Sequence, residues 1–431
     1  MKSSNFQIVL IIVFIVFTVL AVLMFSGFIN IGGSKGDQAI VKDNVTVWGV
    51  LPSGPISSFL QGFNEKSLTL NISYIQKNPE TMYQEYIEAL ANNQGPDLFI
   101  LSNDLFWTFK GRLIETPFES YPLATFRNTF TSQAENYMTD KGILGFPLVV
   151  DPLVMYYNRT LLDQAGIATP PGYWDEFITL APVLTKKTDT TALTQSALAL
   201  GTYSNINNAK EILSAMIMQT GNPIMSSVGG QLRSLINQGD TESILRFYTE
   251  FSNPAKDAFS WSRSLLPSRE SFLANSLAFY FGFGSELFNI QRQNSNLNFD
   301  VAELPQNRQK GTRATFGKMY FIGVSSRSFK PAAATSAISA LSGASAALEL
   351  AKALSLSPAR RDLLASIPAT PFYLGTFYKS ALISKSWIDP KPTETDNIFK
   401  NMIENILSGR FVISQSIQNA QDQLNILVGG R

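Results

Sequence analysis

Residues 142–184 place the strongest constraint on the fold, because they combine several structural signals in a fixed order. A Gly/Pro turn leads into an apolar run with the character of a buried strand, and Asn158 then offers the short acceptor side chain of a helix N-cap. Gly166 can end that helix in the left-handed conformation. A Pro-Pro pair prevents continuation, and the carboxylates of Asp175 and Glu176 suit the first turn of a second helix.

The chain before this segment alternates strand and helix patterns. β-rich runs occur at residues 45–50, 68–75 and 97–101, and helical spacing occurs at residues 56–65 and 83–92. Strands that alternate with helices favour a mainly parallel sheet with helices on both faces. The sequence therefore predicts an α/β fold.

The chain after this segment is mostly helical, with three further strands. The strands are expected to begin near residues 276, 299 and 317, and the helices at residues 208–219, 241–251, 396–407 and 414–427. The Ala/Ser-rich stretch 331–345 is expected to be a loop that leads into a helix near residue 348, where the composition favours helix more strongly.

Composition excludes several classes of chemistry. The 34 basic and 33 acidic residues balance, so no nucleic-acid surface is indicated. The chain has no cysteine and no histidine, which excludes Cys/His zinc sites, disulfides, Ser-His-Asp triads and Cys-His dyads. No glycine-rich nucleotide-binding loop is present. We therefore expect neither a cofactor nor a metal.

The beginning of the chain indicates a membrane segment. Residues 8–29 carry no charge, and as a helix of ~1.5 Å per residue they would extend about 33 Å, enough to cross the hydrocarbon layer. We expect residues 1–30 to be an uncleaved single-pass anchor at the cell membrane, with the large domain outside the cytoplasm. A cleaved signal peptide is the alternative. Residues 31–43 have the Gly-rich, polar composition of a flexible linker.

Several motifs together resemble one known family. In chain order, these motifs are GPDLFILSND, FKGRLIETPFE, GFPLVVDPLVMYYN and AGIATPPGYWDEF. This pattern resembles the extracellular solute-binding proteins of ABC importers, in the branch that binds sugars and oligosaccharides, similar to maltose-binding protein. The resemblance extends over most of the chain after residue 44. Tyr173 departs from it, because a helix-capping Ser or Thr is usual at that position.

The resemblance implies a two-lobed periplasmic-binding-protein fold of type 2, a clamshell that closes on its ligand. Residues 44–150 with 312–367 would form lobe 1, and residues 151–311 with 368–431 would form lobe 2. The chain would cross between lobes near residues 148–154, 306–316 and 366–371. Ligand would bind between the lobes, and an ABC permease would recognise the closed shape.

The resemblance also implies the function. The expected ligand is a small polar solute, most readily a carbohydrate, which would be bound without catalysis. A peptide or another small solute is the fallback, and a surface-anchored interaction protein without a transport role is a further alternative. A carboxylate-dependent glycosidase that uses Asp104 and Asp151 is the remaining alternative, although no catalytic motif supports it.

Asp151 is the first candidate for ligand binding. A carboxylate in the apolar run VVDPLV is costly unless it faces a polar site, and the family often has a sugar-binding carboxylate here. The alternative is a carboxylate that only accepts hydrogen bonds from backbone N–H groups.

Other candidates follow from the chemistry of sugars, whose rings stack on aromatic faces and whose hydroxyls bond to carboxylates and amides. Several have a structural alternative: Trp48 as core packing, and Asn103 or Asp104 as the cap of a helix that begins at Leu105. Tyr156 and Tyr157 should face opposite sides of a strand, and Phe283 replaces the family's usual Trp. The full set of further candidates is Trp48, Gly49, Asn103, Asp104, Tyr156, Tyr157, Phe283, Gly284, Gly317, Tyr320, Phe372 and Tyr373.

Overall fold

The central apolar run forms β7 (Phe146–Asn158), a strand that both halves of the molecule share. Its first part pairs antiparallel with β14 (Thr315–Ser325), and its second part pairs antiparallel with β12 (Leu277–Phe283) and β13 (Phe299–Ala302). Twelve of its 13 residues are buried, so the apolar run reflects a strand covered on both faces. One long strand therefore joins two sheet regions.

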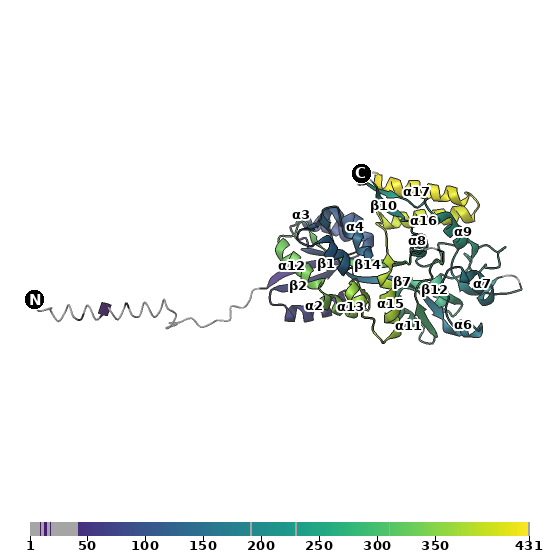
Figure 1. Cartoon of the computed structure of the whole chain (residues 1–431), viewed down its shortest axis with the longest axis horizontal. Coiled ribbons are helices and arrows are strands. Elements are labelled where there is room, and N and C mark those ends of the chain that lie inside the picture. Colours follow the sequence, from purple (N-terminus) through teal and green to yellow (C-terminus); the bar gives the residue numbers. More distant parts are fainter. Residues whose placement is uncertain are drawn as a thin grey trace, which may run out of the picture.

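The first sheet region has the strand order β2-β1-β3-β14-β7. β1 (Asp43–Gly49), β2 (Leu70–Gln76) and β3 (Leu98–Ser102) run parallel, as the strand–helix alternation predicts, and β14 joins them antiparallel. Figure 1 shows the helices of this region around the sheet: α2 (Ser53–Lys66), α3 (Met82–Ala91), α4 (Asn103–Phe109), α12 (Pro331–Leu341) and α13 (Ala344–Leu354).

The second sheet region continues from β7 through β12 and β9 (Leu193–Leu198) to β8 (Lys186–Lys187). Its helices are α6 (Arg159–Gln164), α7 (Glu176–Leu184), α8 (Ala209–Gln219), α9 (Thr241–Glu250), α10 (Ser268–Leu273), α11 (Leu287–Gln293), α16 (Pro392–Leu407) and α17 (Ile413–Gly429). The remaining elements of the two regions are β4 (Leu113–Ile114), β5 (Thr116–Pro117), β6 (Gly142–Ile143), β10 (Met225–Val228), β11 (Gln231–Ser234), β15 (Ser357–Pro358), β16 (Ser384–Lys385), α5 (Leu123–Thr129), α14 (Arg361–Leu364), α15 (Phe372–Leu382), and the 3-10 turns η1 (Lys110–Arg112), η2 (Ser132–Tyr137) and η3 (Gly284–Glu286).

Two separate hydrophobic cores lie under these sheet regions, which we call lobe 1 and lobe 2. On β7 the packing changes from the lobe 1 core to the lobe 2 core between Val150 and Leu153. On β14 it changes between Phe316 and Met319. The two-lobed α/β architecture that the resemblance implied is therefore present.

The third passage between the cores begins near residues 366–371, as expected, because Leu364 lies in the lobe 1 core and Tyr373 packs on the lobe 2 core. Helix α15 packs on both cores, with Phe377 in the lobe 2 core and Tyr378 in the lobe 1 core. The chain leaves the lobe 1 core at Ala381 and enters the lobe 2 core at Trp387. Helix α15 thus follows the expected crossing and contacts both lobes before the chain continues into lobe 2.

The expectation of a loop at residues 331–345 is wrong. Most of this stretch forms helix α12, and α13 begins at Ala344. Pro331 occupies the first turn, where its missing N–H costs nothing, and alanine has the highest helix propensity. The low complexity of the stretch concealed an ordinary buried helix face that includes Ala334, Ala337 and Ile338.

The capping signals of the central segment are confirmed. Asn158 Oδ1 accepts a hydrogen bond from the backbone N–H of Leu161 at the start of α6. Gly166 follows that helix with φ of +70°, a conformation that costs glycine little.

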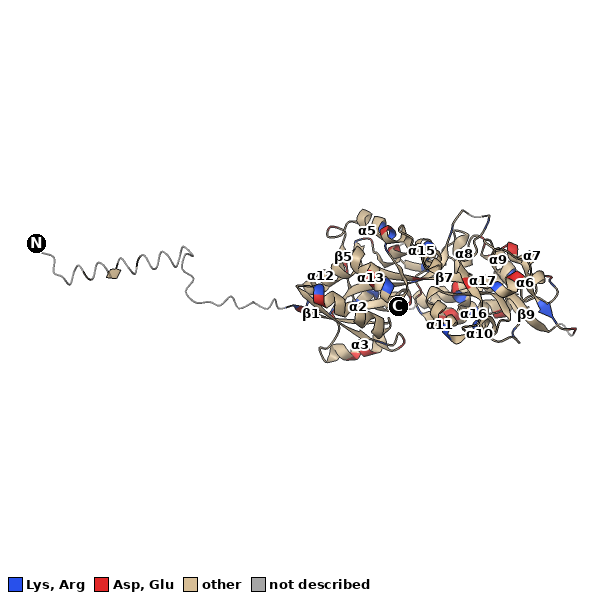
Figure 2. Cartoon of the chain, turned by 90° about the horizontal axis from the view of Figure 1, so that it is seen from below, with Lys and Arg blue, Asp and Glu red and all other residues tan. Residues whose placement is uncertain are grey.

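The structure is a computed structural model that describes residues 42–189, 192–228, 231–309 and 311–429, with four isolated positions at 9, 13, 14 and 18. The expected membrane span, residues 8–29, lies outside the described residues apart from those four. Within the described part no single helix has the length and apolar character of a membrane span. The pair α12 and α13 has them jointly, but it bends by 73°. Figure 2 shows acidic and basic residues scattered over both lobes.

Candidate functional site

Asp151 lies where β7 passes from one core to the other. Its side chain is buried, and Oδ1 accepts a hydrogen bond of 2.9 Å from the backbone N–H of Ser285 in η3. Burial raises the pKa of Asp151 to about 6, although the hydrogen bonds from Ser285 favour the charged form. The carboxylate thus ties the shared strand to the turn that follows β12, and its protonation changes in the range where many proteins work.

Lys318 lies opposite Asp151 in the β7–β14 register. Residues directly opposite each other in an antiparallel pair project from the same face of the sheet. The ammonium group of Lys318 lies 3.4 Å from the carboxylate of Asp104 at the start of α4. Burial lowers the pKa of Lys318, but Asp104 and other neighbours outweigh that effect and raise it to about 12.

Lobe 2 contributes Glu211 to the same charged group. Burial raises the pKa of Glu211, and nearby Asp104 raises it further, whereas Lys210 and Lys318 lower it. The Lys210 ammonium itself is engaged elsewhere, in a buried ion pair of 2.8 Å with Asp389. Charges from both lobes and from the shared strands therefore influence one another at this point.

Asn103 and Tyr320 complete the lobe 1 side. Asn103 is buried, and its Oδ1 accepts a hydrogen bond of 3.1 Å from the backbone N–H of Met319. It does not cap a helix that begins at Leu105, because α4 already begins at Asn103. Tyr320 projects from the same face as Lys318, two residues away on β14, and burial raises its pKa to about 12.

Gly49 is needed for the close approach of an aromatic ring. A Cβ at Gly49 would lie 2.7 Å from the ring of Tyr74 on the neighbouring strand, so a larger residue would displace that ring. The Tyr74 hydroxyl donates to the carbonyl of Leu51. The absence of a side chain at Gly49 therefore leaves room for the Tyr74 ring on the face of the sheet from which Tyr320 also projects.

The Phe283–Gly284 turn is held from both sides. The Tyr156 hydroxyl donates to the carbonyl of Phe283 at 2.7 Å, and Glu286 accepts from the Phe283 N–H at 2.8 Å. A Cβ at Gly284 would meet Asp151 Oδ1 and the Phe377 ring, both at 3.3 Å. These contacts position the turn against Asp151.

Phe372 and Tyr373 lie at the start of α15. Phe372 is 84% exposed, whereas the Tyr373 ring packs against Phe288 and Phe377. Because Phe377 also borders Gly284, Tyr373 is linked to the Phe283–Gly284 turn through the Phe377 ring.

Four candidates lie apart from this group or serve it indirectly. Trp48 is buried in the lobe 1 core under the ammonium of Lys77, 3.9 Å from the ring centroid. A side chain at Gly317 would project from the opposite face of β14, where Gln133 and Ser384 leave no room for it. Tyr156 is a core residue that supports the Phe283 turn, and Tyr157 projects to the other side of β7, as alternation predicts.

The structure adds three residues that the sequence analysis missed: Lys318, Glu211 and Tyr74. The alternation of Lys318 and Tyr320 in the run GKMYFIGV was the available signal for Lys318. Glu211 and Tyr74 gave none, because their places depend on the packing of α8 and on the glycine of a neighbouring strand.

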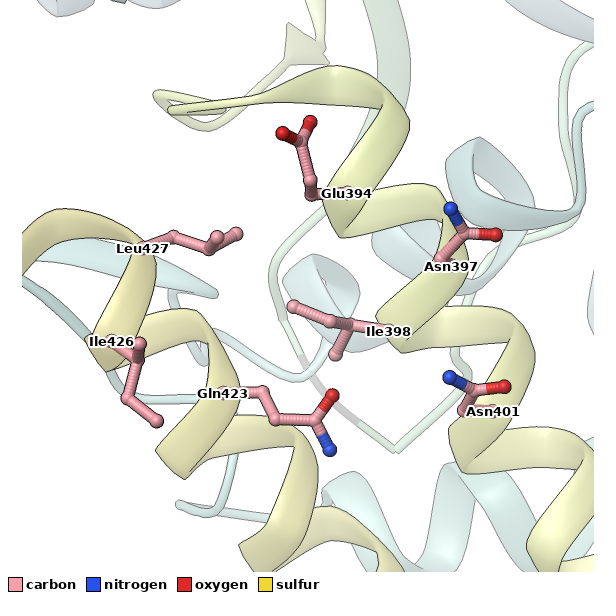
Figure 3. A pocket seen from close by; sticks show the side chains of 7 residues that line it. All are labelled: Glu394, Asn397, Ile398, Asn401, Gln423, Ile426 and Leu427. Carbon is pink, nitrogen blue, oxygen red and sulfur yellow. The ribbon is translucent and has the colours of Figure 1, made fainter.

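Two of the hollows outside this group border lobe 2. One, of about 490 Å³, separates η2 from the end of α8 and from residues 385–388, on the Gln133 side of β14. The other, of about 290 Å³, lies between α16 and α17, and Figure 3 shows Glu394, Asn397, Ile398 and Asn401 on α16 and Gln423, Ile426 and Leu427 on α17 around it. Among the residues that the structure describes, no group of three or more acidic side chains could hold a metal ion.

Comparison with known proteins identifies relatives of this architecture. A family model described as bacterial extracellular solute-binding protein matches residues 59–371. Putative binding proteins of Brucella abortus (strain 2308) and Brucella suis biovar 1 (strain 1330) are each 26% identical over 113 residues. That match spans about a quarter of this chain and about a quarter of each relative.

Solved structures of the same fold extend over nearly the whole chain. A cyclo/maltodextrin-binding protein complexed with maltotetraose is 16% identical, with a TM-score of 0.72, over 92% of this chain and 98% of that one. The cyclic α-maltosyl-1,6-maltose-binding protein of Arthrobacter globiformis is 15% identical, with a TM-score of 0.75, over 90% of this chain and all of that one. The sugar-binding protein MalE of Xanthomonas citri is 14% identical, with a TM-score of 0.72, over 90% and 98%.

Proposed function

Because the chain belongs to the family of bacterial extracellular solute-binding proteins, we propose that it captures a small polar solute, a carbohydrate, between its two lobes. The observation that carries this proposal is the convergence of Asp151, Lys318, Asp104 and Glu211 where the shared strands pass between the cores. Carboxylates and an ammonium group on one surface can pair with the many hydroxyls of a sugar.

Aromatic side chains beside these charges support a carbohydrate rather than a simple ion. Phe283, Tyr320 and Tyr373 offer ring faces for the apolar faces of a sugar. Structural relatives crystallised with maltotetraose, maltotriose and mannotriose are of the same fold. The proposed ligand-binding set comprises Gly49, Asn103, Asp104, Asp151, Phe283, Gly284, Tyr320, Phe372 and Tyr373, with Lys318 and Glu211 added.

The remaining candidates take supporting roles in this proposal. Tyr156 holds the Phe283 turn, and the other three, Trp48, Tyr157 and Gly317, belong to the packing around the site. No covalent chemistry is assigned to any of them. The chain acts as a binding protein and not as an enzyme.

Binding drives closure in this account. Residues 44–150 with 312–367 act as lobe 1, and residues 151–311 with 368–431 act as lobe 2, with α15, the middle of β7 and the start of β14 at the hinge. A ligand that contacts Asp104 and Glu211 together has more contacts in the closed state, and only such differential affinity shifts the equilibrium. An ABC permease then recognises the closed form and takes up the solute.

The membrane segment belongs to the same proposal. The uncharged run 8–29 anchors the chain as a single span, and residues 31–43 tether the lobes outside the cell. Flotation of the full chain with lipid vesicles after alkaline extraction tests this part separately from ligand binding.

A thermal-shift panel on the full chain in detergent tests the ligand class. We expect an oligosaccharide such as maltotetraose or mannotriose to raise the melting temperature, because ligand that binds only the folded state stabilises it. Asp151→Ala should abolish the shift without loss of the circular dichroism spectrum, and Asp257→Ala on the surface should keep it. A panel in which a peptide stabilises the chain and no sugar does contradicts the carbohydrate assignment. Turnover of an oligosaccharide contradicts the purely binding role.

A further inference from the structure

The edge of lobe 1 where β1 begins exposes two large apolar side chains on either side of the incoming chain. Leu68 is 69% exposed and Phe329 is 75% exposed. The backbone N–H of Asp43 donates to the carbonyl of Thr69, next to Leu68. The ammonium of Lys330, next to Phe329, donates to the carbonyl of Asn44 at 2.7 Å. Leu68 and Phe329 therefore flank the point at which the N-terminal tether enters the domain.

Phe329 lies at a surface hollow and is bordered by cationic side chains. It lines a hollow of about 440 Å³ together with Leu90, Ala91, Asn93, Gly95 and Arg327. Two exposed cations, Arg327 and Lys330, border it in the sequence. The nearby carboxylate of Asp97 points inward, where it accepts from the Thr46 N–H and the Ser328 hydroxyl. An exposed ring between two cations matches the apolar and phosphate layers of a bilayer surface.

The length of the tether brings this edge within reach of the membrane. The uncharged run ends at residue 29, and β1 begins at Asp43. The intervening residues, at no more than ~3.6 Å each, extend at most about 50 Å. Figures 1 and 2 both place α12, which begins next to Phe329 and Lys330, at the end of lobe 1 away from lobe 2. The tether therefore holds the Leu68–Phe329 edge, and not lobe 2, nearest to the bilayer.

We propose that this edge, Leu68 and Phe329 with Arg327 and Lys330, is a membrane-contact face that rests on the bilayer surface. The inference depends on the membrane anchor of the proposed function. The apolar side chains enter the headgroup region while the cations remain at the phosphates. The contact orients the molecule, so that lobe 2 remains free to rotate against a lobe 1 held on the membrane.

The absence of native cysteine allows a direct test on the full chain reconstituted in phosphatidylcholine/phosphatidylglycerol vesicles. An environment-sensitive fluorophore on Ser326→Cys reports on the proposed face. The same label on Ile426→Cys, at a position of α17 that is 71% exposed, is the matched control on lobe 2. We expect headgroup spin-labelled lipid to quench the label at 326 at least twofold more than the label at 426. The double variant Leu68→Ser/Phe329→Ser should remove this difference.

Each other outcome overturns the inference in a distinguishable way. Equal quenching at both positions in vesicle-bound protein rejects the contact face and leaves the anchor intact. A chain that does not float with vesicles rejects both. Quenching at 326 that persists in the Leu68→Ser/Phe329→Ser variant means that tether length alone brings the edge close. A change in the fluorescence of the label at 326 that appears only after a permease is added would make this face a protein-docking surface instead.

Discussion

At the scale of single residues, the start of α7 uses a different capping side chain from the one that is usual in the family. Tyr173 stands where the family usually has a capping Ser or Thr, and it makes no cap. Glu176 Oε2 instead accepts hydrogen bonds from the backbone N–H groups of Gly172 and Tyr173, at 2.8 and 3.2 Å. Arg308 covers the Tyr173 ring and pairs with Asp175 and Glu176. The acidic first turn of α7 was predictable from the sequence. That Glu176 would accept hydrogen bonds from the backbone N–H groups that precede the helix was not predictable.

Asp151 illustrates how much of a site one sequence reveals. A carboxylate within an apolar strand indicated a polar partner, and the structure supplies the Ser285 N–H. The identity of that partner could not be predicted, because Ser285 is 134 residues away and its place depends on the β7–β12 register. Lys318 was missed for the same reason, because its partner Asp104 is distant in the sequence.

The raised pKa of Asp151 predicts a pH-dependent stability. The folded-state pKa of about 6 exceeds the ordinary value of 3.8, so the folded protein holds a proton between these pH values. The contribution of Asp151 is therefore fully present below about pH 3.8 and lost as pH rises through 6, by roughly 3 kcal/mol. Asp151→Asn, which keeps the acceptor for Ser285, should match the wild type at pH 4 and exceed its unfolding free energy at pH 7.5. Urea unfolding across this range measures the difference.

Asp257→Asn, which removes an exposed carboxylate but keeps Asp151, is the control for that series, and its unfolding free energy should change with pH as that of the wild type does. A wild type that gains stability over Asp151→Asn as pH rises would mean that the folded state favours the charged carboxylate.

The buried ion pair of Lys210 and Asp389 predicts a large and asymmetric mutational effect. Lys210→Met leaves Asp389 buried beside the Thr395 hydroxyl without its cation, which typically costs about 3–5 kcal/mol. The double variant Lys210→Met/Asp389→Leu should recover much of that loss. Urea unfolding measures both, and Arg246→Met, which breaks an exposed pair with Glu242, should cost less than about 1 kcal/mol. Equal losses in Lys210→Met and Arg246→Met would show that the pair is solvated.

At the scale of elements, local signals predicted most helices and strands, and the failures have physical causes. The strands β1, β2 and β3 and the caps of α6 agree with the patterns, because periodicity and capping are local properties. Helix α12 was missed because its Ala/Ser composition has little amphipathic contrast, although each residue tolerates helix. Its burial against β14 and β1 comes from tertiary packing.

Helix α12 gives a prediction at this scale. Ser336 is exposed in the middle of the helix, so Ser336→Pro should cost about 3 kcal/mol or more, while Ser336→Ala should be neutral or slightly stabilising. Thermal unfolding of the two variants compares them at one position. A proline variant as stable as the alanine variant would indicate that residues 331–341 form a loop.

At the scale of the whole molecule, two cores share strands β7 and β14, while α15 contacts both. The two-lobed arrangement was predictable from the family resemblance and from the alternation of strands and helices. The return of α15 to the lobe 1 core at Tyr378 and Ala381 was not, because nothing in the local sequence shows that the two faces of this helix pack on different cores. The same limit applies to the charged group, which forms only when both lobes are assembled.

The central claim is that ligand brings the two lobes together, and a distance between them tests it most directly. Spin labels on Gln61→Cys in α2 and Arg292→Cys in α11 report on lobe 1 and lobe 2 in a chain without native cysteine. We predict that a saturating oligosaccharide identified by thermal shift shortens the mean distance between the labels, and that Asp151→Ala leaves it unchanged. A stabilising ligand that leaves the distance distribution of the unmutated pair unaltered would contradict the account.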